Sequence, residues 1–249
     1  MTEHPKTMGR IDPARITAFE IPRPDPALIA ALKAVEGPTE LVSDALDDLG
    51  VDGVVGSSIL KPTLSGRVVV GPALTIRNEP LGIPAHEAAR RMVPNRQTDF
   101  EAHNLTRPGD ILVIQGGRDV SNIGGISATM AKRQGGLAAI VDGGIRDLST
   151  SRKIDYPLWC RDVTAQTGRW RQETAEINGA VSICAHRIMP GDIVVADDSG
   201  VCFIPYALLA EVVERVRRRD ETDREYMDFL AGSEPLTAFP RPDPAQFRE

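Results

Sequence analysis

The stretch LAAIVDGGIRDL, residues 137–148, is the part of the chain that best indicates the fold. Its apolar run, flanked by glycine, is typical of a buried strand. Gly143 and Gly144 predict a tight turn, with Arg146 and Asp147 directly after it. The sequence therefore predicts a fixed cation beside a hard-metal ligand at a strand end, where α/β folds usually bind ligands. The alternative is an ordinary turn with two solvated charges.

A similar unit precedes this one, GDILVIQGGRDVSNIGGISATMAKRQGG, residues 109–136. It predicts a strand at residues 111–114 and, after glycine-rich turns, a helix at residues 126–134. A glycine-rich turn that opens a helix exposes unpaired N–H groups at the positive end of the helix dipole, and so predicts an anion site. It is not a phosphate-binding P-loop, because the terminal Gly-Lys-Ser/Thr is absent. The candidate binding residues are Gly124, Gly125, Ile126 and Ser127.

These motifs, taken in order, resemble the RraA-like family. The resemblance rests on GDILVIQGG, IGGISATMAKRQGGLAAIVDGGIRDL, YPLWCRD and MPGDIVVADDSGVCFIP, with LVSDALDDLG and SGRVVVGPALTIRN upstream. It extends over residues 38–219. That family includes the 4-hydroxy-4-methyl-2-oxoglutarate and 4-carboxy-4-hydroxy-2-oxoadipate aldolases, the RNase E regulator RraA, and proteins formerly named demethylmenaquinone methyltransferases. The motif set is specific for the family and less so for one activity within it.

The resemblance implies an α/β fold of the swivelling β/β/α type, with a mixed sheet core flanked by helices. It also implies homotrimers or homohexamers with the active site between subunits. Along the chain we expect an N-terminal arm at residues 1–24, one domain at residues 25–230 and a proline-rich C-terminal arm at residues 231–249.

The family's aldolases require a divalent metal, usually Mg²⁺ or Mn²⁺. Carried onto this chain, Asp147 would hold the metal and Arg146 would contact the 2-oxo acid end of the substrate. Backbone amides around Ile126 and Ser127 would receive the carboxylate. The expected reaction is retro-aldol cleavage that releases pyruvate. Decarboxylation of oxaloacetate uses the same enolate and is expected as a side or main activity.

The chain departs from the family pattern at one position. Aldolases of the family usually carry an acidic residue directly after the glycine that opens the helix, and here that position is Gly125. Asp119 or Asn122 are the candidate substitutes within the chain. Glu221 or Glu225 are candidates for a second family acid, which comes from a neighbouring subunit.

Two other function classes remain open from the sequence. One is a non-catalytic regulator that binds a partner protein, as RraA binds RNase E, and the other is a different lyase or a hydratase acting on a 2-oxo acid. The pair Arg146 and Asp147 argues for chemistry, whereas Gly125 argues for these alternatives.

Composition limits the remaining possibilities. A chain of 249 residues that is 41% hydrophobic can bury a substantial core. Its net charge of −6 argues against nucleic-acid binding, and no apolar run approaches the roughly 18 residues of a membrane span. Scattered cysteines and no visible signal peptide predict free buried thiols and a cytoplasmic location. The cysteines are Cys160, Cys184 and Cys202.

The histidines show no zinc-binding spacing. His86 and His103 lie in residues 79–104, a charged segment that differs between family members, and either is a candidate for facing substrate or for a solvated surface. Asp197 and Asp198 predict a hairpin turn between strands at residues 193–196 and 201–205.

Three helices are predicted outside the site. Asp25 caps one that runs to Val35, a second covers residues 41–49, and a long amphipathic one covers residues 206–230. The sequence PRPDPA occurs at residues 22–27 and again at residues 240–245. The repeat is interpreted as biased composition or as two arms in equivalent grooves between subunits.

Overall fold

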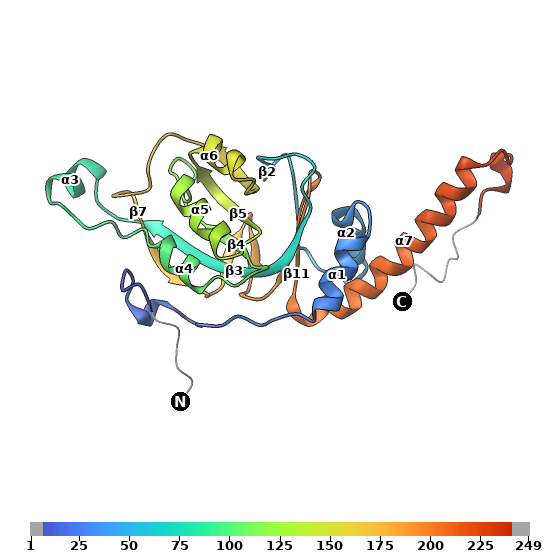
Figure 1. Ribbon diagram of the computed structural model, residues 1–249, viewed down its shortest axis with the longest axis horizontal. Helices are drawn as coiled ribbons and strands as arrows, with labels where there is room; N and C mark the ends of the chain where they lie inside the picture. The colour runs from blue at the N-terminus through green and yellow to red at the C-terminus, as the bar shows by residue number, and fades with distance from the viewer. Residues whose placement is uncertain (1–6, 241–249) are drawn as a thin grey trace, which may run out of the picture.

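The computed structural model describes residues 7–240 and shows a curled mixed sheet flanked by helices (Figure 1). Within these residues, nine strands form the main sheet in the order β1-β11-β10-β3-β4-β5-β6-β2, with β7 pairing with β3, and β8 and β9 form a separate pair. The strands are β1 (Val54–Gly56), β2 (Lys61–Pro62), β3 (Val69–Pro80), β4 (Ile111–Gln115), β5 (Ala138–Ile145), β6 (Leu158–Val163), β7 (Gln172–Ile177), β8 (Val181–Ile183), β9 (His186–Ile188), β10 (Ile193–Ala196) and β11 (Gly200–Ile204). The predicted mixed sheet is confirmed.

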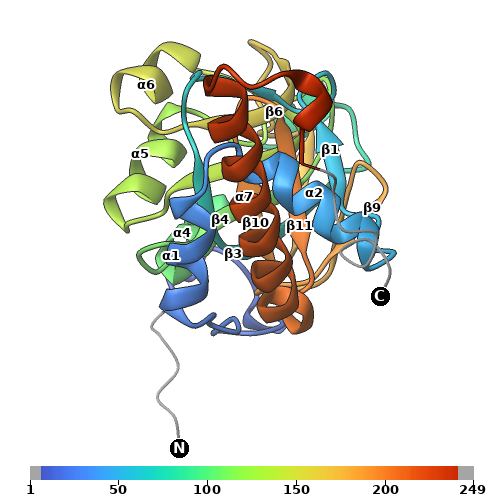
Figure 2. The same cartoon turned by 90° about the vertical axis from the view of Figure 1, so that its right-hand side faces the viewer.

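The helices lie in two groups. α4, α5 and α6 cover one part of the sheet in Figure 1, and Figure 2 shows α7 running alongside α1 and α2 at the other end. The helices are α1 (Pro26–Ala34), α2 (Pro38–Asp48), α3 (Ala85–Arg90), α4 (Asp99–Leu105), α5 (Gly125–Arg133), α6 (Leu148–Lys153) and α7 (Leu209–Ala231), with short 3₁₀ turns at Pro13–Arg15, Tyr206–Leu208 and Leu236–Ala238. No helix in residues 7–240 is long and apolar enough to cross a membrane.

Parallel pairing of β3, β4, β5 and β6 positions the site. In the β4–β5 register, Gln115 lies opposite Asp142, so both strands end at the same edge of the sheet. α5 follows β4 and α6 follows β5. The start of α5 and residues 146–147 therefore meet at the carboxyl edge of the parallel strands, as the two sequence units predicted.

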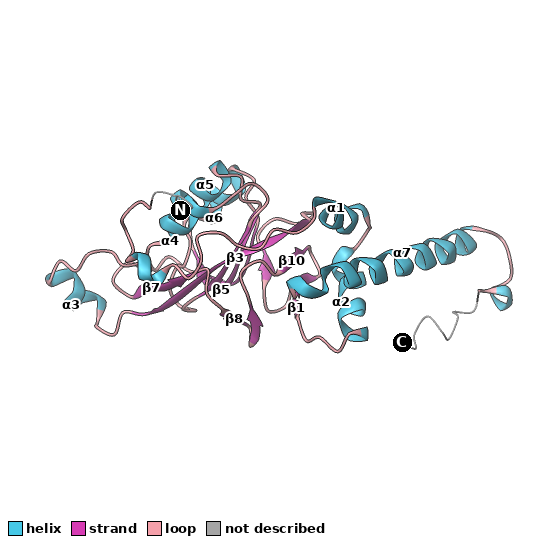
Figure 3. Ribbon diagram, turned by 90° about the horizontal axis from the view of Figure 1, so that it is seen from below, coloured by secondary structure: helices cyan, strands magenta, loops and turns pink. Residues whose placement is uncertain are grey.

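Three apolar clusters hold the layers together. One joins the sheet to α4, α5 and α6, a second joins β10 and β11 to α1, α2 and α7, and a third lies under the β8–β9 pair. Figure 3 shows β8 on the side of the sheet opposite α5 and α6. The core is mostly Val, Ile, Leu and Ala, with Trp159 and Tyr156 as its largest fully buried side chains.

The N-terminal segment is less of an arm than its polar composition suggested. Ile11, Ile16 and Ile21 are buried in the cluster beneath α4, α5 and α6. Their spacing of five residues matches neither the helical nor the strand period, so periodicity does not indicate this packing. Residues 1–6 and residues 241–249 lie outside the described residues. The second PRPDPA copy, residues 240–245, therefore falls outside them except for Pro240.

The three helices predicted outside the site are present in the structure, but two of them begin at different residues. Asp25 caps α1, because its carboxylate accepts a hydrogen bond from the N–H of Ala27 at 2.8 Å. α2 begins at Pro38 rather than Leu41, with Gly37 in the left-handed region before it. The long C-terminal helix begins as a 3₁₀ turn at Tyr206 and becomes α-helical at Leu209.

Gly143 and Gly144 do not form the predicted tight turn; both lie within β5. Their role is close packing, because a Cβ on Gly143 would lie 2.6 Å from the carbonyl oxygen of Gly117, and one on Gly144 would lie 2.7 Å from that of Val120. The change of direction falls at Asp147, whose φ is 57°.

The hairpin at Asp197 and Asp198 is confirmed, because β10 and β11 pair antiparallel around it. The Asp197 carboxylate is buried and accepts the hydroxyl hydrogen bond of Thr39 at 2.7 Å. All three cysteines are free thiols. Cys160 and Cys202 are buried as predicted, but Cys184 is only half-buried.

Leu46→Ala should lower the free energy of unfolding by about 2–5 kcal/mol, because it empties a fully buried site between α2 and its neighbours. Urea unfolding measures the change. Leu236→Ala is the matched control, since Leu236 is 73% exposed and should shift stability by less than about 0.5 kcal/mol. Equal effects from the two variants would contradict the packing described for α2.

Candidate functional site

A cavity of about 400 Å³ lies at the carboxyl edge of β4 and β5. This size is within the usual range of small-ligand pockets. Five parts of the chain line it: residues 9–10, residues from 94 to 100, residue 121 with residues 124–127, residues 146–147, and residues 167–169. The six positions predicted from the two glycine-rich units therefore share one cavity.

Arg146 and Asp147 are held at the cavity by local backbone geometry. Asp147 takes the left-handed conformation at the start of α6, and its Oδ2 accepts the N–H of Gly125 at 2.9 Å. Arg146 Nε lies 3.6 Å from the same oxygen. A Cβ on Gly124 would lie 2.9 Å from Asp147 Oδ2, so glycine there makes room for the carboxylate. Both side chains keep over two fifths of their surface exposed, at 41% and 46%.

The start of α5 presents unpaired N–H groups to the same cavity. Gly124 is its N-cap and supplies no side-chain hydrogen bond, and the first bond of the helix runs from the N–H of Ala128 to the carbonyl of Gly124. Within residues 7–240, the N–H groups of Ile126 and Ser127 have no acceptor. Together with the helix dipole, they form an anion-binding site.

Asn122 has a role other than the one suggested for it. It is fully buried, and its Nδ2 donates to the carbonyl oxygens of Gly117 at 2.9 Å and Gly144 at 3.1 Å. Its Oδ1 accepts from Asn78 Nδ2 at 3.2 Å. These bonds fix the loop between β4 and α5. Asp119 is exposed on that loop and is not among the residues that line the cavity.

Glu221 and Glu225 lie exposed on the outer half of α7. Figure 1 shows that half of the helix projecting away from α5 and α6. Within one chain neither residue reaches the cavity. Their suggested role concerns a neighbouring subunit and stays a prediction.

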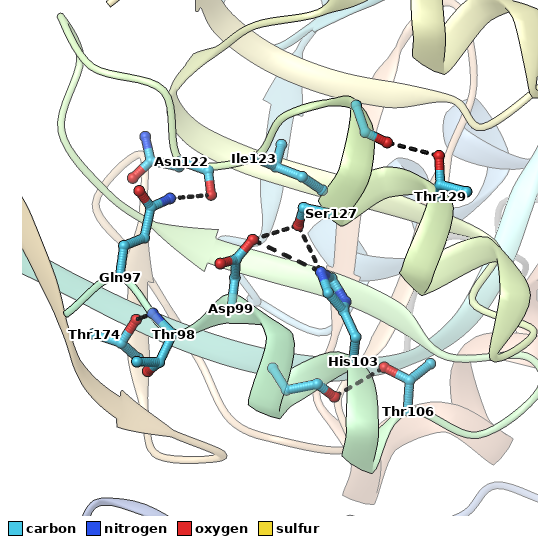
Figure 4. Close-up of polar contacts among 12 residues, drawn as sticks. Gln97, Thr98, Asp99, His103, Thr106, Asn122, Ile123, Ser127, Thr129 and Thr174 are labelled. Carbon is cyan, nitrogen blue, oxygen red and sulfur yellow. Dashed lines mark hydrogen bonds and ion pairs between the residues drawn. The ribbon is translucent and has the colours of Figure 1, made fainter. Parts of the chain in front are cut away.

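A buried polar cluster beside the cavity was not found from the sequence (Figure 4). Asp99 and His103 lie one helical turn apart on α4, and both contact Ser127 of α5. The Ser127 hydroxyl makes a short hydrogen bond to Asp99 Oδ2 and lies 2.6 Å from His103 Nε2. The spacing of four residues between Asp99 and His103 was a signal, since it places both on one helix face.

Two further lining residues carried no signal in the sequence. Arg10 reaches the cavity because the segment before it is tied to α4, where the Glu101 carboxylate accepts the N–H of Met8 at 2.8 Å. The Arg10 guanidinium lies over the ring of Phe100, 5.4 Å from its centroid. Gln97 is anchored by its Nε2, which donates to the carbonyl of Asn122 at 2.8 Å.

The segment at residues 79–104 thus contributes to the site only through its second half. His86 lies exposed on α3, which Figure 1 shows projecting from the domain, and His103 is buried behind Ser127.

A family model described as Aldolase/RraA, of the RraA-like family, matches residues 39–203. This is more than half of the 249 residues. The chain belongs to the RraA-like family. The resemblance expected from the ordered motifs is confirmed.

Two relatives show the range of this RraA-like family. A Halalkalibacterium halodurans protein with the provisional name 4-hydroxy-4-methyl-2-oxoglutarate aldolase is 30% identical over 188 residues, covering 75% of this chain and 81% of that protein. Protein DlpA of Legionella pneumophila is 33% identical over 178 residues, covering 70% of this chain. The match spans only 27% of DlpA itself.

Solved structures agree with this assignment. Streptomyces coelicolor RraAS2, described as an unusual member of the RNase ES inhibitor RraA protein family, is 25% identical with a TM-score of 0.68, covering 83% of this chain and 98% of that one. An uncharacterized Pseudomonas syringae pv. tomato protein is 26% identical with a TM-score of 0.71, covering 87% and 98%. The family therefore includes proteins named as aldolases and as inhibitors.

The residues at the cavity fit a divalent metal held by one carboxylate. Asp147 Oδ2 is fixed by Gly125, while Oδ1 accepts no hydrogen bond from the described residues. No group of three or more His, Cys, Asp or Glu side chains suited to a metal occurs in residues 7–240. Mg²⁺ binds through one or two carboxylates and keeps several waters, so this donor set suits Mg²⁺ or Mn²⁺ better than zinc.

Thr150 of α6 occupies the space that an acidic side chain at position 125 would need. A Cβ on Gly125 would lie 2.8 Å from Thr150 Cβ and 3.0 Å from its Oγ1. Gly125→Asp should therefore lower the free energy of unfolding by about 1–3 kcal/mol through crowding between α5 and α6. Urea unfolding of Gly125→Asp, Thr150→Gly and the double variant measures it. We expect the double variant to be more stable than the sum of the singles predicts, and strict additivity would contradict the contact.

Proposed function

We propose that this RraA-like protein is a divalent-metal-dependent lyase that acts on a 2-oxo acid and releases pyruvate. Retro-aldol cleavage is the leading reaction, and decarboxylation of oxaloacetate is the second reaction of the same site. The observation that carries the proposal is the meeting of Arg146 and Asp147 with the unpaired N–H groups of α5 in one cavity. A cation, a metal-ligating carboxylate and an anion site are the three parts that such chemistry needs.

The free N–H groups of Ile126 and Ser127 would bind the carboxylate of the 2-oxo acid. Arg146, beside them, would donate to the 2-oxo oxygen and stabilise the negative charge that develops there as the carbon–carbon bond breaks. Asp147 would hold the metal, which when bound supplies further electrophilic stabilisation of that charge. No lysine lines the cavity among the described residues, so the proposal uses no Schiff base.

The charge of the cavity favours a substrate with two carboxylates. Arg10 and Arg169 line it in addition to Arg146. Oxaloacetate and 4-hydroxy-4-methyl-2-oxoglutarate both carry a second carboxylate, which one of these two guanidinium groups would neutralise.

The test is pyruvate release from each of these two substrates with Mg²⁺, with Mn²⁺ and with EDTA. We expect turnover that needs protein and metal together and exceeds the metal-only rate. The ratio of the two rates assigns the main reaction. Absence of turnover with either metal would contradict the proposal and favour a different substrate or the regulator, which pull-down with RNase E would examine.

A further inference from the structure

The cluster of Asp99, Ser127 and His103 lies between α4 and α5 (Figure 4), at one wall of the cavity. Asp99 and Ser127 line the cavity, whereas His103 lies behind them and is fully buried. Apolar residues such as Ala102, Ala128 and Ala131 also pack in the buried cluster beside α4 and α5. A buried polar chain that ends in a ligand cavity is therefore a candidate for function.

The Nδ1 of His103, unpaired within residues 7–240, indicates the direction of the hydrogen bonds within the cluster. His103 Nδ1 is buried with no partner in the described residues. A buried N–H without an acceptor costs more than a bare acceptor nitrogen, so the proton of the neutral ring resides on Nε2. His103 Nε2–H then donates to the Ser127 oxygen, and the Ser127 hydroxyl donates to Asp99 Oδ2. In this series of hydrogen bonds, the Ser127 hydroxyl is the donor to the carboxylate of Asp99.

Two opposing effects act on Asp99. Burial raises the pKa of its carboxyl group to about 6, although the hydrogen bond from Ser127 acts to lower this pKa. Burial lowers the pKa of His103 to about 4, so the ring stays neutral where Asp99 titrates. The charged or titratable groups around Asp99 are Arg10, Glu101, His103, Arg146, Asp147 and Arg169.

Resting on the proposed function, we propose that Asp99 is the residue that moves the proton at this site, and that Ser127 and His103 are its positioning residues. The proposal places an acid at the cavity from α4, where the acid expected at Gly125 is missing from α5. Asp147 does not serve both roles, because its Oδ2 is already held by Gly125 beside Arg146.

In the retro-aldol reaction the Asp99 carboxylate takes the proton of the C4 hydroxyl. The C3–C4 bond breaks, C4 becomes a carbonyl carbon, and the electron pair stays with C3 as the enolate of pyruvate. Asp99 then gives the same proton to C3, which completes pyruvate and restores the carboxylate. No proton is gained or lost overall.

In decarboxylation of oxaloacetate the C3–C4 bond breaks with loss of CO₂, and the electron pair again stays on C3. The protonated Asp99 gives its proton to C3, and the carboxylate then takes one proton from solvent. The two reactions therefore begin from opposite protonation states of the same residue.

This difference predicts opposite pH profiles. Retro-aldol cleavage needs the carboxylate, so its kcat should fall as the pH drops below the pKa of Asp99, about 6. Decarboxylation needs the carboxylic acid, so its kcat should fall as the pH rises above that value. Ser127→Ala removes the hydrogen bond that lowers the pKa of Asp99. It should therefore move both limbs, meaning the fall of kcat for each reaction with pH, to higher pH.

The experiment measures kcat and KM of both reactions from about pH 5 to pH 8 for the metal-loaded protein. Asp99→Asn should lower kcat by about 10²–10⁴-fold, abolish both limbs and leave KM little changed. His103→Gln should shift the limbs without removing them. Asp192→Asn is the matched control, because Asp192 is a buried carboxylate with a raised pKa outside the cavity, and it should keep both profiles.

A readout without turnover accompanies the kinetics. Carbon NMR of the Asp99 carboxyl group should show a pKa near 6 that rises in Ser127→Ala. Thermal unfolding shows whether each variant is folded. If the wild-type protein turns over both substrates and folded Asp99→Asn matches it, the role of Asp99 is overturned while the lyase stands. If the wild-type protein turns over neither, both proposals fail.

Discussion

Asp147→Asn should lower metal-dependent pyruvate release by about 10³-fold or more, since loss of a bound Lewis acid costs several kcal/mol of transition-state stabilisation. Asparagine suits the backbone here, because Asp147 has a φ of 57° and asparagine tolerates the left-handed region. Its amide oxygen can still accept the N–H of Gly125. The variant therefore removes the charge with little change in shape.

The measurement is initial rate against Mg²⁺ or Mn²⁺ concentration, together with metal affinity by calorimetry. Asp155→Asn is the matched control, because Asp155 is also an exposed, left-handed aspartate that pairs with an arginine, Arg67, but lies outside the cavity. It should retain wild-type rates. Full activity of folded Asp147→Asn at low metal concentration would contradict the assignment of the metal ligand.

Arg146→Ala should reduce kcat by about 10²–10³-fold, the usual cost of losing one donor to a developing negative charge. KM should also rise, since the same guanidinium contacts the bound 2-oxo acid in the proposed pose. Arg146→Lys should recover part of kcat, because lysine restores the charge without the planar donor arrangement.

Steady-state kinetics with oxaloacetate and with 4-hydroxy-4-methyl-2-oxoglutarate test this prediction. Arg67→Ala is the control, since the Arg67–Asp155 pair is 2.9 Å long and similarly exposed, yet neither residue lines the cavity. A loss confined to KM in Arg146→Ala would show that the arginine only binds substrate and does not stabilise the transition state.

Much of the fold and part of the site could be predicted from local sequence signals. The predicted strand at residues 111–114 and the glycine-ended apolar run at residues 137–144 correspond to β4 and β5. The glycine-rich unit before Ile126 predicted an anion site, and α5 does leave two N–H groups unpaired there. Such features depend on residues close together in the chain, so pattern and spacing are enough to indicate them.

Other features depend on contacts between distant segments. Arg10 lines the cavity next to a segment whose Met8 N–H binds the carboxylate of Glu101, 93 residues away in sequence. An acidic side chain at position 125 would force the neighbouring atoms to shift, because Thr150 of α6 packs against Gly125. Neither neighbour can be identified from the residues on either side in the chain.

Local patterns in the sequence were enough to indicate the family, the order of strands and helices around the site, and the pair Arg146 and Asp147 at a strand end. The convergence of Asp99 and His103 of α4 on Ser127 of α5 becomes visible only when the two helices are packed together. The physical reason is burial. Hydrophobic periodicity reports which face of an element is covered, whereas the pKa of a carboxyl group depends on which groups from other elements remove it from water.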